Sequence, residues 1–71
     1  MARKPSFSRL IRDTRIQRGL SVAEVAERVG VSGPCVYLWE TGRSQPRNAN
    51  LSALCKVLKL PIRATKDLFA A

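Results

Sequence analysis

The strongest constraint on the fold is a pair of helix start signals that lie close together, at Ser21 and Ser32. Ser21 and Glu24 have the spacing of a capping box, in which each side chain accepts a hydrogen bond from the other residue's backbone N–H. Gly30 ends the first helix, and Ser32 caps the second, with Pro34 in the first turn where a missing N–H costs little. Two short helices joined by such a tight turn must cross steeply.

The rest of the chain also follows a helical pattern, and no segment alternates as a strand would. We expect helices over about 7–18, 22–29, 33–40 and 62–70. A further helix is expected to end before Leu60-Pro61, capped by Asn48 or Asn50. The apolar stripes that would form the core are Phe7, Leu10, Ile11 and Thr14; Val22, Val25, Ala26 and Val29; Val36 and Trp39; Leu51, Leu54, Cys55 and Leu58; and Ile62, Leu68 and Phe69.

These stripes predict an all-α fold, a compact five-helix bundle, over residues 7–71. Residues 1–6 are expected to form a flexible basic N-terminal arm, because Pro5 bars a helix before it and Ser6 can cap a helix that starts at Phe7. Seventy-one residues leave room for a binding surface but not for a separate sensing or catalytic domain.

The charge balance points to a polyanionic partner. Thirteen Lys and Arg against five Asp and Glu give a net charge of +8, which suits nucleic acid first and an anionic membrane surface second. No apolar run is long enough to span a bilayer, and the N-terminus lacks the apolar stretch of a signal peptide. We therefore expect a cytoplasmic protein that binds double-stranded DNA through the second helix of the motif.

The residue inventory argues against an enzyme and against a metal site. The chain has no His, and Cys35 and Cys55 match no metal-ligand spacing. Both cysteines are expected to pack as small apolar side chains, with a redox role for Cys35 as the alternative. We expect no cofactor and no small-molecule ligand.

Over about residues 7–69 the chain resembles the Cro/C1-type (XRE-type) helix-turn-helix family of phage repressors and bacterial regulators. The resemblance is carried by Ile11, Arg15, Gly19-Leu20-Ser21, Val25-Ala26, Val29-Gly30-Val31-Ser32, Val36, Glu40-x-Gly42, Pro46, Leu51, Leu54-Cys55 and Leu58-x-Leu60. It implies the fold of phage-repressor DNA-binding domains and a transcriptional regulator, a repressor, acting on a pseudo-palindromic operator. It also implies a structural ion pair between Arg15 and Glu40.

Two departures from the family pattern affect the expected DNA contacts. The family often has Gln at the first position of the second helix, where this chain has Val22, so that only the backbone N–H can hold a phosphate there. The recognition helix often begins with a polar side chain, but here Ser32 is followed by Gly33 and Pro34. Readout of base edges must therefore come from other positions.

Helix geometry selects the residues that face outward once Val36 and Trp39 are assigned to the core. The candidates for base or groove contact are Ser32, Gly33, Pro34, Tyr37, Leu38 and Arg43. Arg43 could bind guanine in a bidentate manner, or a phosphate. The candidates for phosphate contact are Ser21, Val22, Thr41, Gln45, Arg47, Arg3 and Lys4.

The apolar C-terminal end could serve either of two roles. Leu68 and Phe69 either close the core of the monomer or form a two-fold interface, and we expect a homodimer, at least on DNA.

The exposed apolar residues of the second motif helix leave one other function open. They could bind a partner protein, as in an antitoxin or a phage protein that contacts a host factor.

Overall fold

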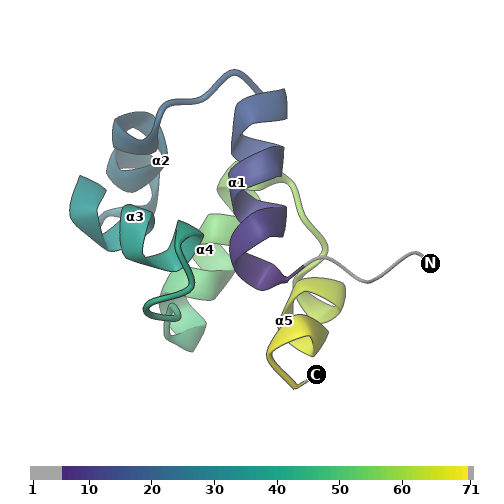
Figure 1. Ribbon diagram of the computed structural model, residues 1–71. Coiled ribbons are helices and arrows are strands. Elements are labelled where there is room, and N and C mark those ends of the chain that lie inside the picture. The colour runs from purple at the N-terminus through teal and green to yellow at the C-terminus, as the bar shows by residue number, and fades with distance from the viewer. Residues whose placement is uncertain (1–5, 71) are drawn as a thin grey trace.

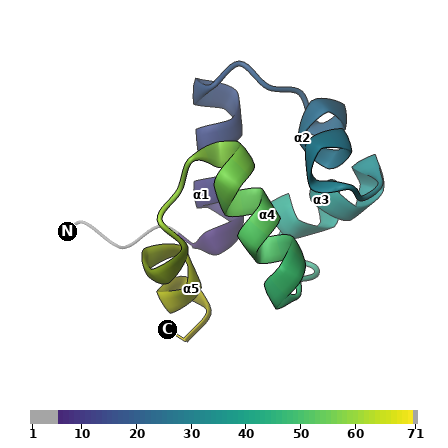
Figure 2. The ribbon, with the colours of Figure 1, turned by 180° about the vertical axis from the view of Figure 1, so that it is seen from behind.

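The computed structural model describes residues 6–70, with side chains for residues 6–68. Within this range the chain forms five α-helices: α1 (Phe7–Gln17), α2 (Val22–Val29), α3 (Gly33–Glu40), α4 (Asn48–Leu58) and α5 (Ile62–Ala70). Figure 1 shows α2 and α3 side by side at one end of the bundle, with α5 at the other end and α1 between them. The view from behind shows α4 crossing the bundle against α1 (Figure 2). The predicted all-α five-helix fold is confirmed.

The core is built from the apolar stripes of the first four helices. Its members are Phe7, Ile11, Val25, Ala26, Val36, Trp39, Leu51, Leu54, Cys55 and Leu58, all buried. Trp39 is the largest fully buried side chain. Because Trp39 and Val36 occupy the inner face of α3, the opposite face of that helix must point to solvent.

The two start signals form as the sequence predicts. Ser21 accepts a hydrogen bond from the N–H of Glu24, and the Glu24 carboxylate accepts one from the N–H of Ser21. Ser32 caps α3 by accepting from the N–H of Cys35 at 3.3 Å. Gly30 ends α2 with φ 92°, a left-handed conformation that favours glycine. These contacts fix the tight turn and hence the steep crossing of α2 and α3.

The predicted boundaries of α1 and α4 need correction. Helix α1 ends at Gln17, one residue early, with Arg18 as its C-cap. Neither Asn48 nor Asn50 caps α4: Asn48 is already helical, and the N-cap is Arg47, whose side chain makes no cap bond. The entry into α4 is anchored instead by Pro46, which is buried, and by the Arg47 carbonyl, which accepts from the N–H of Leu51 at 2.8 Å.

The predicted inner stripe of α5 is also partly wrong. Ile62 is 42% exposed, and among the side chains described in this helix, residues 62–68, the buried one is the polar Thr65. The Thr65 hydroxyl donates its proton to the Pro61 carbonyl at 2.8 Å, so its one donor is satisfied inside the fold. Leu68 is half-buried, and the side chain of Phe69 lies outside the described residues.

Candidate nucleic-acid interface

The outward face of α3 is mostly hydrocarbon. Pro34, Tyr37 and Leu38 are all exposed, Tyr37 by 58% and Leu38 by 38%. These positions are three and four residues apart, so their side chains share one face of the helix. Helix α3 carries no basic residue in its last turn and no acidic residue in its first. The face therefore presents a phenol hydroxyl and apolar surface, and no charge.

The two hydroxyl residues at the ends of α3 are already engaged with its backbone. Ser32 accepts from the N–H of Cys35, which leaves its proton available to an outside acceptor. The Thr41 hydroxyl donates to the carbonyls of Tyr37 and Leu38, at 3.1 and 3.2 Å. Thr41 can therefore accept a hydrogen bond from outside but has no second proton to give to a phosphate.

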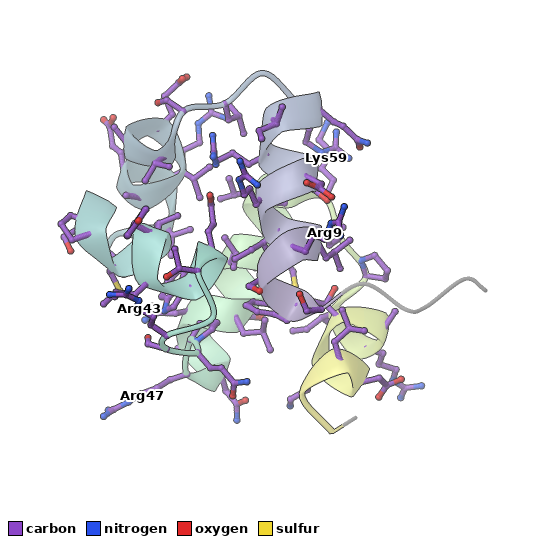
Figure 3. All side chains as sticks on the ribbon, in the orientation of Figure 1. Arg9, Arg43, Arg47 and Lys59 are labelled. Carbon is purple, nitrogen blue, oxygen red and sulfur yellow. The ribbon has the colours of Figure 1, made fainter. Side chains whose placement is uncertain are left out.

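The loop after α3 brings cations beside this face. The N–H groups of Arg43 and Ser44 both donate to the Leu38 carbonyl, at 3.0 and 3.3 Å, which fixes the start of the loop against the helix. Arg43, Gln45 and Arg47 are exposed. Figure 3 shows Arg43 and Arg47 reaching outward on the α3 side of the bundle, whereas Arg9 and Lys59 lie on the α1 side.

The N-terminus of α2 is capped by its own side chains and is therefore less open to an anion than an uncapped helix N-terminus. The backbone N–H and the hydroxyl of Ser21 both belong to the capping box with Glu24. The hydrogen bond from the Ser21 N–H lowers the pKa of Glu24, so the carboxylate stays charged at neutral pH. A phosphate at this end would meet the N–H groups of Val22 and Ala23 beside a negative charge.

Arg15 of α1 and Arg18, the C-cap of that helix, bond to elements behind this face. The Arg15 guanidinium donates to both carboxylate oxygens of Glu40, from Nε at 2.7 Å and from Nη2 at 3.0 Å, and to the Leu20 carbonyl from Nη1 at 2.9 Å. The Arg18 Nε donates to the Leu58 carbonyl at 2.7 Å. The Arg18 contact and the burial of Thr65 have no sequence signal that would single them out.

The sequence candidates fall into three groups in space. The face of α3 and the loop after it bring together Ser32, Gly33, Pro34, Tyr37, Leu38, Thr41, Arg43, Gln45 and Arg47. Ser21 and Val22 lie at the start of α2, which packs against α3. Leu68 lies on α5, where it lines a pocket together with Gly42, Ser44 and Gln45 of the loop after α3. Arg3 and Lys4 lie outside the described residues.

The sequence model of the protein family described as "Helix-turn-helix domain" matches residues 6–69 of this chain. The chain belongs to the helix-turn-helix domain family. It is 36% identical over 56 residues to the cryptic phage CTXphi transcriptional repressor RstR of Vibrio cholerae, a match that covers 79% of this chain and 50% of that protein. The chain thus spans about half the length of this curated relative.

Solved structures with the same fold include a repressor and a regulator bound to DNA. The P22 c2 repressor in complex with a synthetic operator superimposes with a TM-score of 0.83 at 27% identity, covering 87% of this chain and 94% of that one. SinR, a master regulator for biofilm formation, in complex with DNA, has a TM-score of 0.77 at 24% identity, covering 86% and 98%. The resemblance to Cro/C1-type regulators and the phage-repressor fold are confirmed.

Two kinds of feature are absent from the described residues. No helix among them has the length and apolar character needed to cross a membrane. In the same part of the chain no three His, Cys, Asp or Glu side chains gather as metal ligands would.

Proposed function

We propose that this helix-turn-helix chain is a sequence-specific double-stranded DNA-binding transcriptional regulator, a repressor, that inserts α3 into the major groove of its operator. The observation that carries the proposal is the uncharged, exposed face of α3 bordered by Arg43 and Arg47. A helix that enters the groove needs a face free of anions, and cations beside it can neutralise phosphates. The likeness to a repressor in complex with its operator supports this use of the fold.

The proposal assigns phosphate contacts mainly to the loop. Arg43, Arg47 and Gln45 have exposed side chains with donors, and Thr41 contributes less because its proton is bonded within α3. At the start of α2, Val22 would contribute through its backbone N–H. Ser21 would contribute through its hydroxyl proton, since its N–H is bonded to Glu24. Arg3 and Lys4 would add cationic contacts from the arm.

We also propose that the chain binds DNA as a homodimer through α5. An apolar groove of about 350 Å³ runs between α1 and α5, and its apolar lining is Leu10, Leu60, Pro61, Ala64 and Leu68. A second copy that covered this groove would bury apolar surface of both chains in a two-fold interface. Ala64→Arg should then shift the protein to monomer in sedimentation, whereas Ala49→Arg, at an exposed alanine of α4, should not.

A salt titration of binding to duplex DNA tests the main proposal. Neutralisation of several phosphates predicts that the logarithm of the affinity falls steeply and linearly with the logarithm of salt concentration. Selection from a random duplex library should return an inverted repeat with half-sites about one helical turn apart. A flat salt dependence with no selected sequence would support the alternative function, in which α3 binds a partner protein.

A further inference from the structure

The outward face of α3 offers very little for hydrogen bonding to base edges. Of the four positions that point outward, Pro34 and Leu38 carry only carbon, and Thr41 has given its proton to carbonyls of its own helix. Tyr37 keeps one phenol hydroxyl, and its ring adds further apolar surface. At the start of the helix, Gly33 has no side chain and Ser32 can donate one hydrogen bond.

The major groove has only one apolar feature that such a face could recognise. Each base pair presents hydrogen-bond donors and acceptors there, and thymine adds its C5-methyl group. A Leu side chain placed against a purine edge or a cytosine amino group would remove water from polar atoms without replacing their hydrogen bonds. Against a methyl group the same side chain buries apolar surface on both partners.

We propose that the apolar face of α3, with Leu38 at its centre, recognises the C5-methyl groups of pyrimidines. The proposal rests on the proposed DNA-binding function and names the chemical group that this site selects. Thymine and 5-methylcytosine carry the same methyl at the same place in the groove. The face therefore accepts both bases and discriminates against cytosine and uracil, which lack the methyl. Methylation of a cytosine within the half-site strengthens binding.

Leu38 is suited to this role because its backbone is held in place. Its carbonyl accepts hydrogen bonds from the N–H groups of Arg43 and Ser44 and from the Thr41 hydroxyl, so the last turn of α3 and the loop are tied together at this residue. Pro34, one turn earlier on the same face, is rigid as well. A preorganised apolar surface loses little conformational freedom when it meets a methyl group.

The test uses a duplex selected from a random library by the wild-type protein. Each thymine is replaced in turn by deoxyuridine, which removes the methyl and leaves base pairing intact. Burial of one methyl-sized group corresponds to about a fourfold change in affinity. We expect deoxyuridine to weaken binding by about fourfold at one or two positions per half-site. With cytosine placed at the same position, its 5-methylation should strengthen binding by a similar factor.

Two variants connect the methyl effect to the helix face. Leu38→Ala should fold, since Leu38 is exposed, and should bind the thymine and deoxyuridine duplexes equally. Ile16→Ala removes another exposed aliphatic side chain, from α1, and should keep the full methyl effect. Thermal melts of both variants check that each is folded.

The outcomes separate this inference from the function on which it rests. Wild-type binding that is indifferent to every methyl, or a methyl effect that survives in Leu38→Ala, overturns methyl recognition by this face and leaves DNA binding intact. A selected half-site without thymine also overturns it. Failure to bind any duplex overturns the proposed function itself.

Discussion

Glu40, the last residue of α3, is held by Arg15 of α1 through two hydrogen bonds of 2.7 and 3.0 Å. The two side chains are only 6% and 14% exposed. The hydrogen bond to Glu40 raises the pKa of Arg15, a side chain that is already charged throughout the usual pH range of proteins. A third bond, from Arg15 to the Leu20 carbonyl, extends the contact to the loop before α2. The end of α3 is therefore positioned by charge as well as by the burial of Trp39.

We expect Glu40→Ala to lower the free energy of unfolding by about 3 kcal/mol, because it leaves the Arg15 charge largely buried without its partner. DNA binding should fall only as far as the folded fraction falls. Denaturant melts of Arg15→Ala, Glu40→Ala and the double variant form a cycle that measures the coupling between the two side chains. Glu40→Gln is the matched control, since it keeps a hydrogen-bond acceptor and removes the charge. A coupling near zero would show that the pair adds nothing to stability.

Most of the fold could be predicted from the sequence because local signals and burial agree there. The capping box at Ser21 and the stripe that includes Val36 and Trp39 each specify a helix and its inner face without help from the rest of the chain. The start of α4 could not be predicted, since asparagine is a favoured N-cap but the N-cap here is Arg47, which follows the buried Pro46. Burial of Thr65 instead of Ile62 likewise depends on tertiary packing.

The candidate site was predictable in its residues and less so in their chemistry. Helix periodicity is enough to place Tyr37 and Leu38 on the outward face, and both are exposed. It does not reveal that the Thr41 hydroxyl donates its proton to carbonyls of α3. Such local hydrogen bonds compete with any outside ligand, and only coordinates show which partner each atom has.

Gly30, which ends α2, and Gly33, which begins α3, should respond differently to alanine. Gly30 has φ 92°, so Gly30→Ala should cost about 1–2 kcal/mol from backbone strain, although no atom lies within 4 Å of the added Cβ. Gly33 is helical, and beyond its chain neighbours no atom lies within 4 Å of an added Cβ. The ring of Pro34 disfavours the helical conformation for a preceding residue that has a Cβ, which offsets the usual gain of about 0.4–1 kcal/mol, so Gly33→Ala should leave the stability nearly unchanged. Thermal melts of the two variants measure both effects. Equal shifts of the same sign would contradict the conformations assigned to these glycines.

Arg18 should stabilise the end of α4 through its 2.7 Å hydrogen bond to the Leu58 carbonyl. Arg18→Ala should lower the free energy of unfolding by about 1 kcal/mol, the usual net value of one such bond at a partly exposed site. Arg12→Ala, at an exposed arginine of the same helix, controls for the loss of a positive charge. Urea unfolding of the two variants compares their free energies of unfolding directly. An equal loss of stability in both would mean that the Arg18 hydrogen bond makes no net contribution to stability.

The variant Arg43→Ala should show whether Arg43 binds a base or a phosphate. Arg43→Ala should weaken operator binding by about 1–3 kcal/mol, with a relaxed preference at one position per half-site, if Arg43 binds guanine. If Arg43 only neutralises a phosphate, all duplexes should weaken alike, and the salt slope should fall by about one unit. Arg9→Ala, on the α1 side, is the control (Figure 3). Unchanged affinity and slope in Arg43→Ala would remove this residue from the interface.

Tyr37 carries the one phenol on the outward face of α3, and its removal separates the polar contribution of that face from the apolar one. Tyr37→Phe keeps the ring, so the fold and the apolar contact should be unchanged, whereas operator binding should lose about 0.5–1.5 kcal/mol for one hydrogen bond. Tyr37→Ala should lose more, because the apolar contact of the 58% exposed ring disappears as well. Titrations of the two variants against the selected duplex, with thermal melts beside them, measure both contributions. If both variants bind DNA as the wild type does and instead lose a protein partner in a pull-down, α3 is a protein-binding surface. The groove assignment would then be wrong.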